Sequence, residues 1–148
     1  MITRWQGKWL LGFVKERLLQ RSFKRFSEGL AFPDAWVENY EPLVNLLELP
    51  DEKDRHVLAA AIKANASIIV TNNIKDFPKE YLSSFGLTAK SADEFLTEII
   101  DWNDSLALEA FKTLVLNRIS PYLDEFEVLD RLRRVGLSNS ADYLHTLL

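Results

Sequence analysis

The most informative pattern of apolar and polar positions lies in residues 51–77, DEKDRHVLAAAIKANASIIVTNNIKDF. Asp51 is a favoured helix N-cap residue type, and the apolar side chains after it recur at helical spacing, so a helix is predicted to begin there. Those side chains are Val57, Leu58, Ala61 and Ile62. The segment Ile68–Val70 is a short apolar run between polar residues, which predicts a strand covered on both faces in a parallel sheet.

Polar side chains follow that strand directly. Thr71, Asn72 and Asn73 lie at its carboxyl end, where ligands bind in open α/β sheets. Asp76 comes shortly after them, and Asp54 begins the preceding helix. We therefore expect the aspartates on the two sides of the strand to converge on a shared pocket.

Residues 1–30 carry large apolar side chains near a single helical stripe, which predicts a long first helix. The stripe consists of Trp5, Trp9, Phe13, Leu18, Leu19, Phe23, Phe26 and Leu30. If nothing in the chain covered these side chains, they would form an exposed apolar patch, and such patches are usually protein interfaces. This predicts a protein partner, a homo-oligomer or a separately encoded amino-terminal fragment that completes the domain.

Shorter elements are predicted along the rest of the chain. A strand over 35–40, a helix over 43–47, a helix over 78–82 and a strand over 87–89 complete the first part. Four more helices are predicted beyond residue 91, two of them from the capping-box pairs Ser91 with Glu94 and Asp124 with Glu127. We place the boundary near Trp102, which gives a sheet domain over 1–102 and a helical extension over 103–148.

Composition limits the chemistry. The 148-residue chain has no cysteine, which excludes a disulfide framework, a thiolate zinc site and a cysteine nucleophile, and a reducing cytoplasm is expected. Neither a signal peptide nor a membrane span is predicted. Residues 1–30 carry a net charge of +5 and residues 93–130 one of −8. The basic stretch is either a phosphate-binding face or an ordinary solvated surface.

A divalent cation site is the most specific chemistry that the residues suggest. Mg²⁺ and Mn²⁺ prefer carboxylate and carbonyl oxygens, which Asp51, Asp54 and Asp76 would supply. Asn73 would add a neutral oxygen ligand or position a water molecule. Each residue also has an ordinary explanation, because aspartates are favoured in the first turn of a helix and asparagines in turns.

The stretch from Asp54 to Ala61, the strand end Val70–Asn73 and the residues Lys75–Phe77 resemble the VapC-like branch of the PIN-domain family. The segments 31–35 and 49–51 are also similar to this branch. The resemblance implies an α/β, Rossmann-like three-layer fold with a short parallel sheet. It also implies metal-dependent cleavage of RNA, in which Asp54, Asn73 and Asp76 are the catalytic candidates, and an antitoxin as protein partner.

The family pattern begins with an apolar strand that ends in an aspartate and takes another acid from a later helix, and neither is matched here. We therefore expect a PIN-like domain that is incomplete at its amino end. Three hypotheses follow. The first is a Mg²⁺- or Mn²⁺-dependent endoribonuclease whose missing acids come from another chain or from Glu16 or Asp34. The second is an inactive remnant that binds or regulates another protein, and the third is a purely structural interaction domain.

Overall fold

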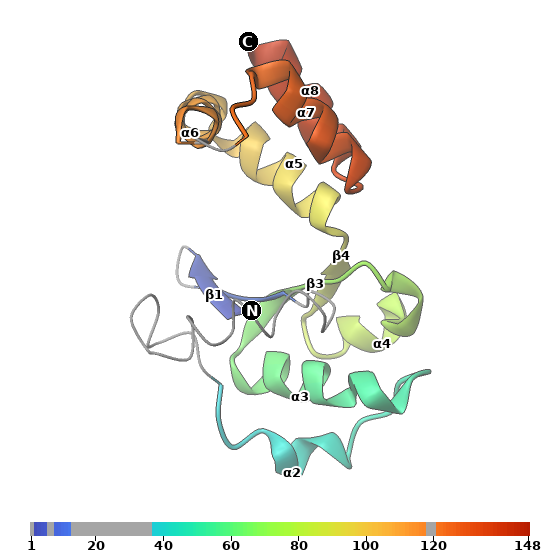
Figure 1. Ribbon diagram of the computed structural model, residues 1–148. Coiled ribbons are helices and arrows are strands. Elements are labelled where there is room, and N and C mark those ends of the chain that lie inside the picture. The colour runs from blue at the N-terminus through green and yellow to red at the C-terminus, as the bar shows by residue number, and fades with distance from the viewer. Residues whose placement is uncertain (1, 6–7, 13–36, 118–120) are drawn as a thin grey trace. The chain divides into compact units, whose positions relative to one another are not determined.

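The computed structural model describes residues 2–5, 8–12, 37–117 and 121–148 (Figure 1). Contacts divide the chain into two compact units, Met1–Ser91 and Ala92–Leu148, and each is described by itself below. The sequence-based boundary at residue 102 differs from this division by one helix, Ala92–Trp102. Within the described residues, none of the helices is both long enough and apolar enough to cross a membrane.

A four-stranded mixed sheet forms the centre of the first unit, in the order β1-β2-β3-β4. The strands are β1 (Ile2–Trp5), β2 (Lys8–Gly12), β3 (Ala66–Val70) and β4 (Thr88–Lys90). Strand β1 is antiparallel to β2, whereas β2, β3 and β4 are parallel. Ile69 of β3 lies opposite Leu11 on one side and Ala89 on the other, so β3 is an inner strand.

Helix α3 (Arg55–Lys63) packs against β3 and β2 and supplies much of the core of this unit. Leu58, Ala59 and Ala61 are fully buried, as is Ile69 of the strand. The small alanine side chains let the helix backbone lie close to the sheet, as the sequence predicts. Asn65 ends the connection to β3 with a φ of 51°, a left-handed conformation that asparagine tolerates better than most residues.

Two short helices flank α3 on the same side of the sheet, namely α2 (Glu41–Val44) and α4 (Lys79–Ser83) (Figure 1). The turn that follows helix α4 ends at Gly86, whose φ of 70° permits the backbone bonds Gly86 N to Ser83 O and Leu87 N to Leu82 O. The described residues of this unit thus form a sheet with helices on one side, and the predicted α/β fold with a short parallel sheet is confirmed.

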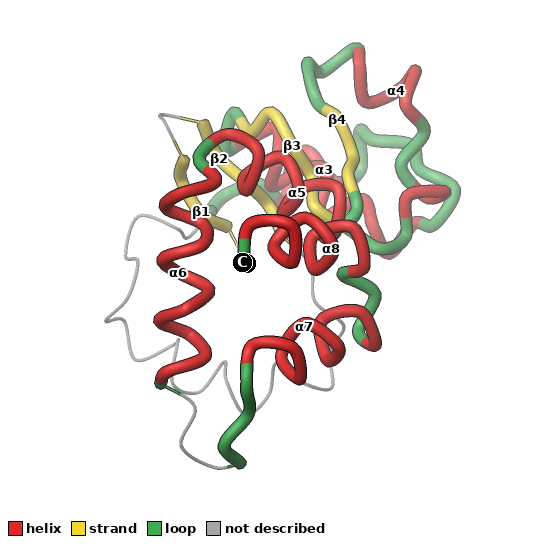
Figure 2. Tube along the Cα trace, turned by 90° about the horizontal axis from the view of Figure 1, so that it is seen from above, coloured by secondary structure: helices red, strands yellow, loops and turns green. Residues whose placement is uncertain are grey.

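The second unit consists of α5 (Ala92–Trp102), α6 (Asp104–Leu116), α7 (Glu125–Arg134) and α8 (Ser138–Leu147). Helix α8 packs against both α5 and α7 (Figure 2). The core of the unit contains Phe111, Leu129 and Leu144, all buried. The predicted capping box of α7 is confirmed, because Asp124 accepts from the backbone of Glu127 and Glu127 accepts from the backbone of Asp124.

Helix α8 receives its cap from a residue distant in the sequence. Its N-cap position is Leu137, which has no capping side chain, and Asp93 of α5 takes that role. The Asp93 carboxylate accepts hydrogen bonds from Asn139 N at 2.9 Å and from Ser140 N at 2.8 Å. Ser140 Oγ also donates to Asp93 Oδ1 at 2.7 Å. Asp93 therefore ties α5 to the start of α8.

The amino-terminal prediction is wrong where the structure describes it. Trp5 and Trp9 lie on β1 and β2, not on a helix, because pairing with neighbouring strands satisfies the backbone of both segments. Arg4 and Lys8, which were assigned to a basic helix, are strand residues as well. The remaining members of the predicted stripe and of the basic face, from residue 13 onward, lie outside the described residues.

Smaller differences concern residues 37–47. Residues 37–40 are not in a strand, and residues 35 and 36 of that prediction lie outside the described part of the chain. The helix predicted over 43–47 is instead α2, Glu41–Val44, because Pro42 is well tolerated in a first helical turn, where its missing N–H is not needed.

Candidate metal centre

Three carboxylates converge at the start of α3. Asp51, Asp54 and Asp76 each offer an oxygen, and these oxygens all lie within 4.8 Å of one another. Asp51 caps the 3₁₀ turn η2 (Glu52–Asp54), Asp54 ends that turn, and Asp76 ends the 3₁₀ turn η3 (Ile74–Asp76) after β3. The expectation that the aspartates on both sides of the strand share one location is confirmed.

Local hydrogen bonds hold two of the carboxylates in place. Asp51 Oδ1 accepts from Lys53 N at 2.9 Å, which is the capping role that the sequence offers as its ordinary explanation. The Asn73 side-chain amide donates to Asp76 Oδ2. Thr71, which is 7% exposed at the end of β3, accepts from Asn73 N at 3.1 Å and so fixes the turn that carries both residues.

Electrostatic repulsion within the cluster is visible at Asp54. Burial raises the pKa of Asp54, the neighbouring Asp51 and Asp76 raise it further, and the charge of His56 acts in the opposite direction. A carboxylate that is costly to ionise in this way is stabilised in its charged form by a cation.

The donor set suits a hard divalent cation. All three groups are carboxylates, which Mg²⁺ and Mn²⁺ favour over the nitrogen and sulfur ligands of zinc sites. Oxygen ligands of an octahedral Mg²⁺ ion lie about 3.0 Å apart when adjacent and about 4.2 Å apart when opposite. The carboxylate oxygens, which lie within 4.8 Å of one another, would therefore have to move closer by side-chain rotation to share one ion. The described residues fit such an ion, with water filling the remaining positions.

Asn73 contacts the cluster through its side-chain amide, which donates to Asp76, three residues later. That spacing, within one turn, is the signal from which the contact could have been inferred. The role of Asn73 as a neutral ligand or as a residue that positions water stays a prediction. Asn72 is exposed, and Glu16 and Asp34, proposed as additional acids, lie outside the described residues.

The chain is similar to known protein families over most of its length. Residues 11–75 match the family model of the PIN domain, and residues 92–146 match that of the VapC50 C-terminal domain. The putative ribonuclease VapC50 of Mycobacterium tuberculosis is 42% identical over 72 residues, which cover 49% of this chain. The chain spans 40% of the length of that relative. No solved structure matches the chain significantly.

The two family matches fall on different units of the structure. The PIN-domain match ends at residue 75 and so contains Asp51, Asp54 and Asn73, while the second match covers helices α5 to α8 almost completely. The two matches together cover most of the chain and, with the α/β architecture around the carboxylates, they support a VapC-like member of the PIN-domain family.

Proposed function

We propose that this protein is a metal-dependent endoribonuclease that hydrolyses phosphodiester bonds at the carboxylate cluster. Asp51, Asp54 and Asp76 would hold Mg²⁺ or Mn²⁺. The observation that carries the proposal is that their oxygens lie within 4.8 Å of one another. The residues come from two turns, one before and one after β3 in the sequence. The similarity to VapC50, a putative ribonuclease, supports RNA as the substrate.

When bound, a divalent ion lowers the pKa of a water molecule and neutralises charge on the phosphate under attack. The residues of the chain prepare the site for this chemistry. Asn73 orients Asp76 through its amide, and the raised pKa of Asp54 means that a bound cation would stabilise its charged form. Asn73 is thus proposed as a positioning residue, and the three aspartates as metal ligands.

A cleavage assay on RNA tests the proposal. The wild-type protein should cleave single-stranded RNA in Mg²⁺ or Mn²⁺ and lose this activity in EDTA. Asp54→Asn removes one ligand charge with little change of shape and should abolish cleavage, whereas Asp104→Asn, an equivalent change at an exposed residue of α6, should not. Cleavage that survives Asp54→Asn would contradict the assigned role.

A protein partner is also proposed, with an antitoxin as the expected kind. Large apolar side chains on α6 support this, because Leu106 is 57%, Leu114 51% and Leu116 81% exposed. A homo-oligomer or an amino-terminal complementing fragment would be detected by the same binding experiments. The cysteine-free sequence suits a reducing cytoplasm, where we place the activity.

The alternative function, an inactive PIN remnant that binds or regulates another protein, predicts a different result. Such a protein would bind its partner through surfaces such as α6 and would cleave no RNA in any divalent ion. Metal-dependent cleavage that requires Asp54 would therefore rule it out.

A further inference from the structure

The side chain of Arg55 is incompletely paired although it lies next to the carboxylate cluster. Arg55 follows Asp54 directly and is the first residue of α3. Its Nη2 donates to Glu52 Oε1 at 3.1 Å, and its side chain is 26% exposed. Within the described part of the chain, its Nε is buried and has no hydrogen-bond partner.

The bond to Glu52 satisfies Nη2 of this guanidinium but leaves Nε without a partner. The Glu52 side chain is 79% exposed, and ion pairs between side chains of this kind contribute little to stability. A buried donor without an acceptor is unfavourable and calls for an explanation. The Nε and Nη2 atoms form one edge of the planar guanidinium group, and that edge matches two oxygens of a phosphate.

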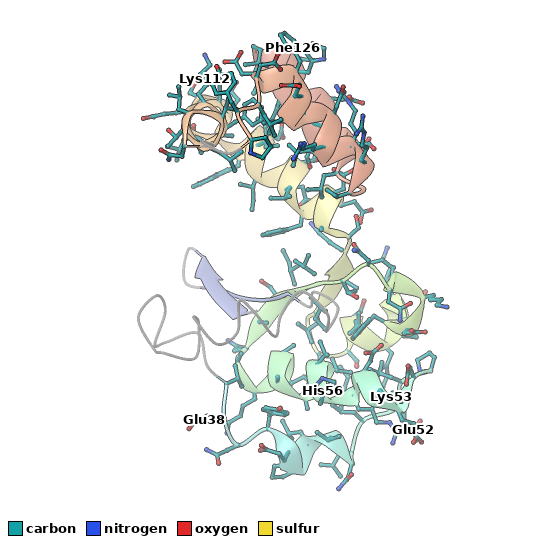
Figure 3. The ribbon with its side chains drawn as sticks, viewed as in Figure 1. Glu38, Glu52, Lys53, His56, Lys112 and Phe126 are labelled. Carbon is teal, nitrogen blue, oxygen red and sulfur yellow. The ribbon has the colours of Figure 1, made fainter. Side chains whose placement is uncertain are left out.

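The contact with Glu52 also fixes where this edge lies. Nη2 reaches back three residues to η2, the turn that Asp51 caps and Asp54 ends. Figure 3 shows Glu52 and Lys53 at this amino-terminal end of α3. Arg55 is therefore held on the same turn that supplies two of the three carboxylates of the cluster.

Charge at the cluster gives a reason for an arginine here. Three ionised aspartates carry −3, and one divalent ion reduces this only to −1, so a phosphodiester anion would still be repelled. A cation beside the cluster removes the repulsion. Lys53 can contribute as an exposed point charge, but a guanidinium both neutralises the phosphate and orients it through two hydrogen bonds.

We propose that Arg55 binds a phosphate of the RNA strand, which replaces Glu52 on Nη2 and provides the missing acceptor for Nε. Glu52 holds the guanidinium in place until the strand arrives. The proposal rests on the proposed function in that the strand is the substrate. Arg55 is accordingly a substrate-binding residue, and the metal ligands remain the three aspartates.

An RNA-binding experiment tests the role of Arg55. Fluorescence anisotropy measures the affinity for a labelled single-stranded RNA of mixed sequence over a range of salt concentrations. The experiment uses Asp54→Asn protein in EDTA, which removes both cleavage and part of the repulsion. One lost phosphate contact lowers the slope of log affinity against log salt by about 0.7. We expect Arg55→Gln to show this loss of slope together with an affinity at least about tenfold weaker at low salt, as for a lost hydrogen bond to a charged group.

Three further variants control for folding and for general charge. Lys63→Gln removes a charge from the exposed far end of α3 and should leave the slope unchanged. Arg55→Lys should keep the salt slope, because the positive charge remains. It should not keep the full RNA affinity, because lysine lacks the two parallel N–H donors of the guanidinium edge. Glu52→Gln should strengthen binding, because it removes the competing acceptor, and its exposure makes a folding defect unexpected. Thermal melting of each variant verifies the fold.

The proposal is overturned if Arg55→Gln, or Arg55→Lys where the glutamine variant does not fold, binds RNA like its parent. It is also overturned if Lys63→Gln has the same effect, if Glu52→Gln weakens binding, or if the parent binds no RNA at low salt. Failure of the proposed function looks different: wild-type protein would then cleave no RNA in Mn²⁺, while the Arg55-dependent salt slope would remain.

Discussion

Removal of the Asp93 carboxylate tests how the second unit is held together. Asp93 is 9% exposed and accepts three hydrogen bonds from the first turn of α8, two from backbone N–H groups and one from the Ser140 hydroxyl. Asp93→Ala leaves the two backbone N–H groups without their acceptor, whereas the Ser140 hydroxyl keeps the backbone carbonyl of residue 93 within reach at 3.1 Å. The variant also removes a negative charge from the amino end of a helix, where the helix dipole favours it.

The cost can be worked from these contacts. Loss of an N-cap side chain costs about 0.5–2 kcal/mol, and a hydrogen bond to a charged group contributes about 1.5–3 kcal/mol. The three bonds share one carboxylate and are not additive, and water reaches part of the opened site. We therefore expect Asp93→Ala to lower the free energy of unfolding of this unit by about 3 kcal/mol, mainly through the donors left without partners.

The same contacts predict a pH dependence. Burial acts to raise the pKa of Asp93, but the hydrogen bonds from Ser140 and Asn139 outweigh it, so the pKa lies below its ordinary value. Because the folded-state pKa is the lower one, this stabilisation is complete above the unfolded-state pKa, near 4, and is lost as pH falls through the folded-state value. Stability should therefore decline below about pH 4 in the wild type and decline less in Asp93→Asn.

Hydrogen exchange of peptides from α8 measures the loss of stability in Asp93→Ala at that helix, and urea unfolding measures it for the whole chain. A loss of about 3 kcal/mol corresponds to exchange that is roughly a hundredfold faster at α8. Glu109→Ala, which removes an exposed carboxylate from α6, is the matched control and should change little. Unchanged exchange in Asp93→Ala, or an equal change in Glu109→Ala, would refute the assigned role of Asp93.

Two further substitutions probe the first unit. Leu58→Ala empties a fully buried position between α3 and the sheet and should cost about 2–5 kcal/mol in urea unfolding, whereas Leu46→Ala, at a side chain 76% exposed, should stay within about 0.5 kcal/mol of wild type. Asn73→Ala removes the donor that orients Asp76 and should weaken Mn²⁺ binding about tenfold by calorimetry. Asn72→Ala, at the exposed neighbour, should leave the affinity unchanged, and equal affinities of all three proteins would contradict the role of Asn73.

Local patterns were sufficient to predict α3, β3 and the convergence of their flanking aspartates. The alanine-rich helix and the apolar strand carry their own periodicity, and the carboxyl end of a parallel strand is a general location for polar ligands. The capping box of α7 was equally predictable, because both partners lie within four residues. In each case the interaction that fixes the structure is close in the sequence.

Non-local interactions explain what the sequence did not reveal. Trp5 and Trp9 have a helical spacing, but β1 and β2 pair with each other and β2 pairs with β3, which is more than fifty residues distant. Gly7, a residue type that is unfavourable inside helices and common in turns, was a local signal against a helix. The cap that Asp93 provides for α8 joins residues 46 and 47 positions apart, and no short-range pattern indicates it.

Calorimetric titration of Mn²⁺ into the wild-type protein tests the central claim, that Asp51, Asp54 and Asp76 form one metal-binding cluster. The account predicts saturable binding at one site, its loss in Asp54→Asn, and its retention in Asp104→Asn. Absence of binding heat in the wild type, or equal binding in the wild type and Asp54→Asn, would contradict it.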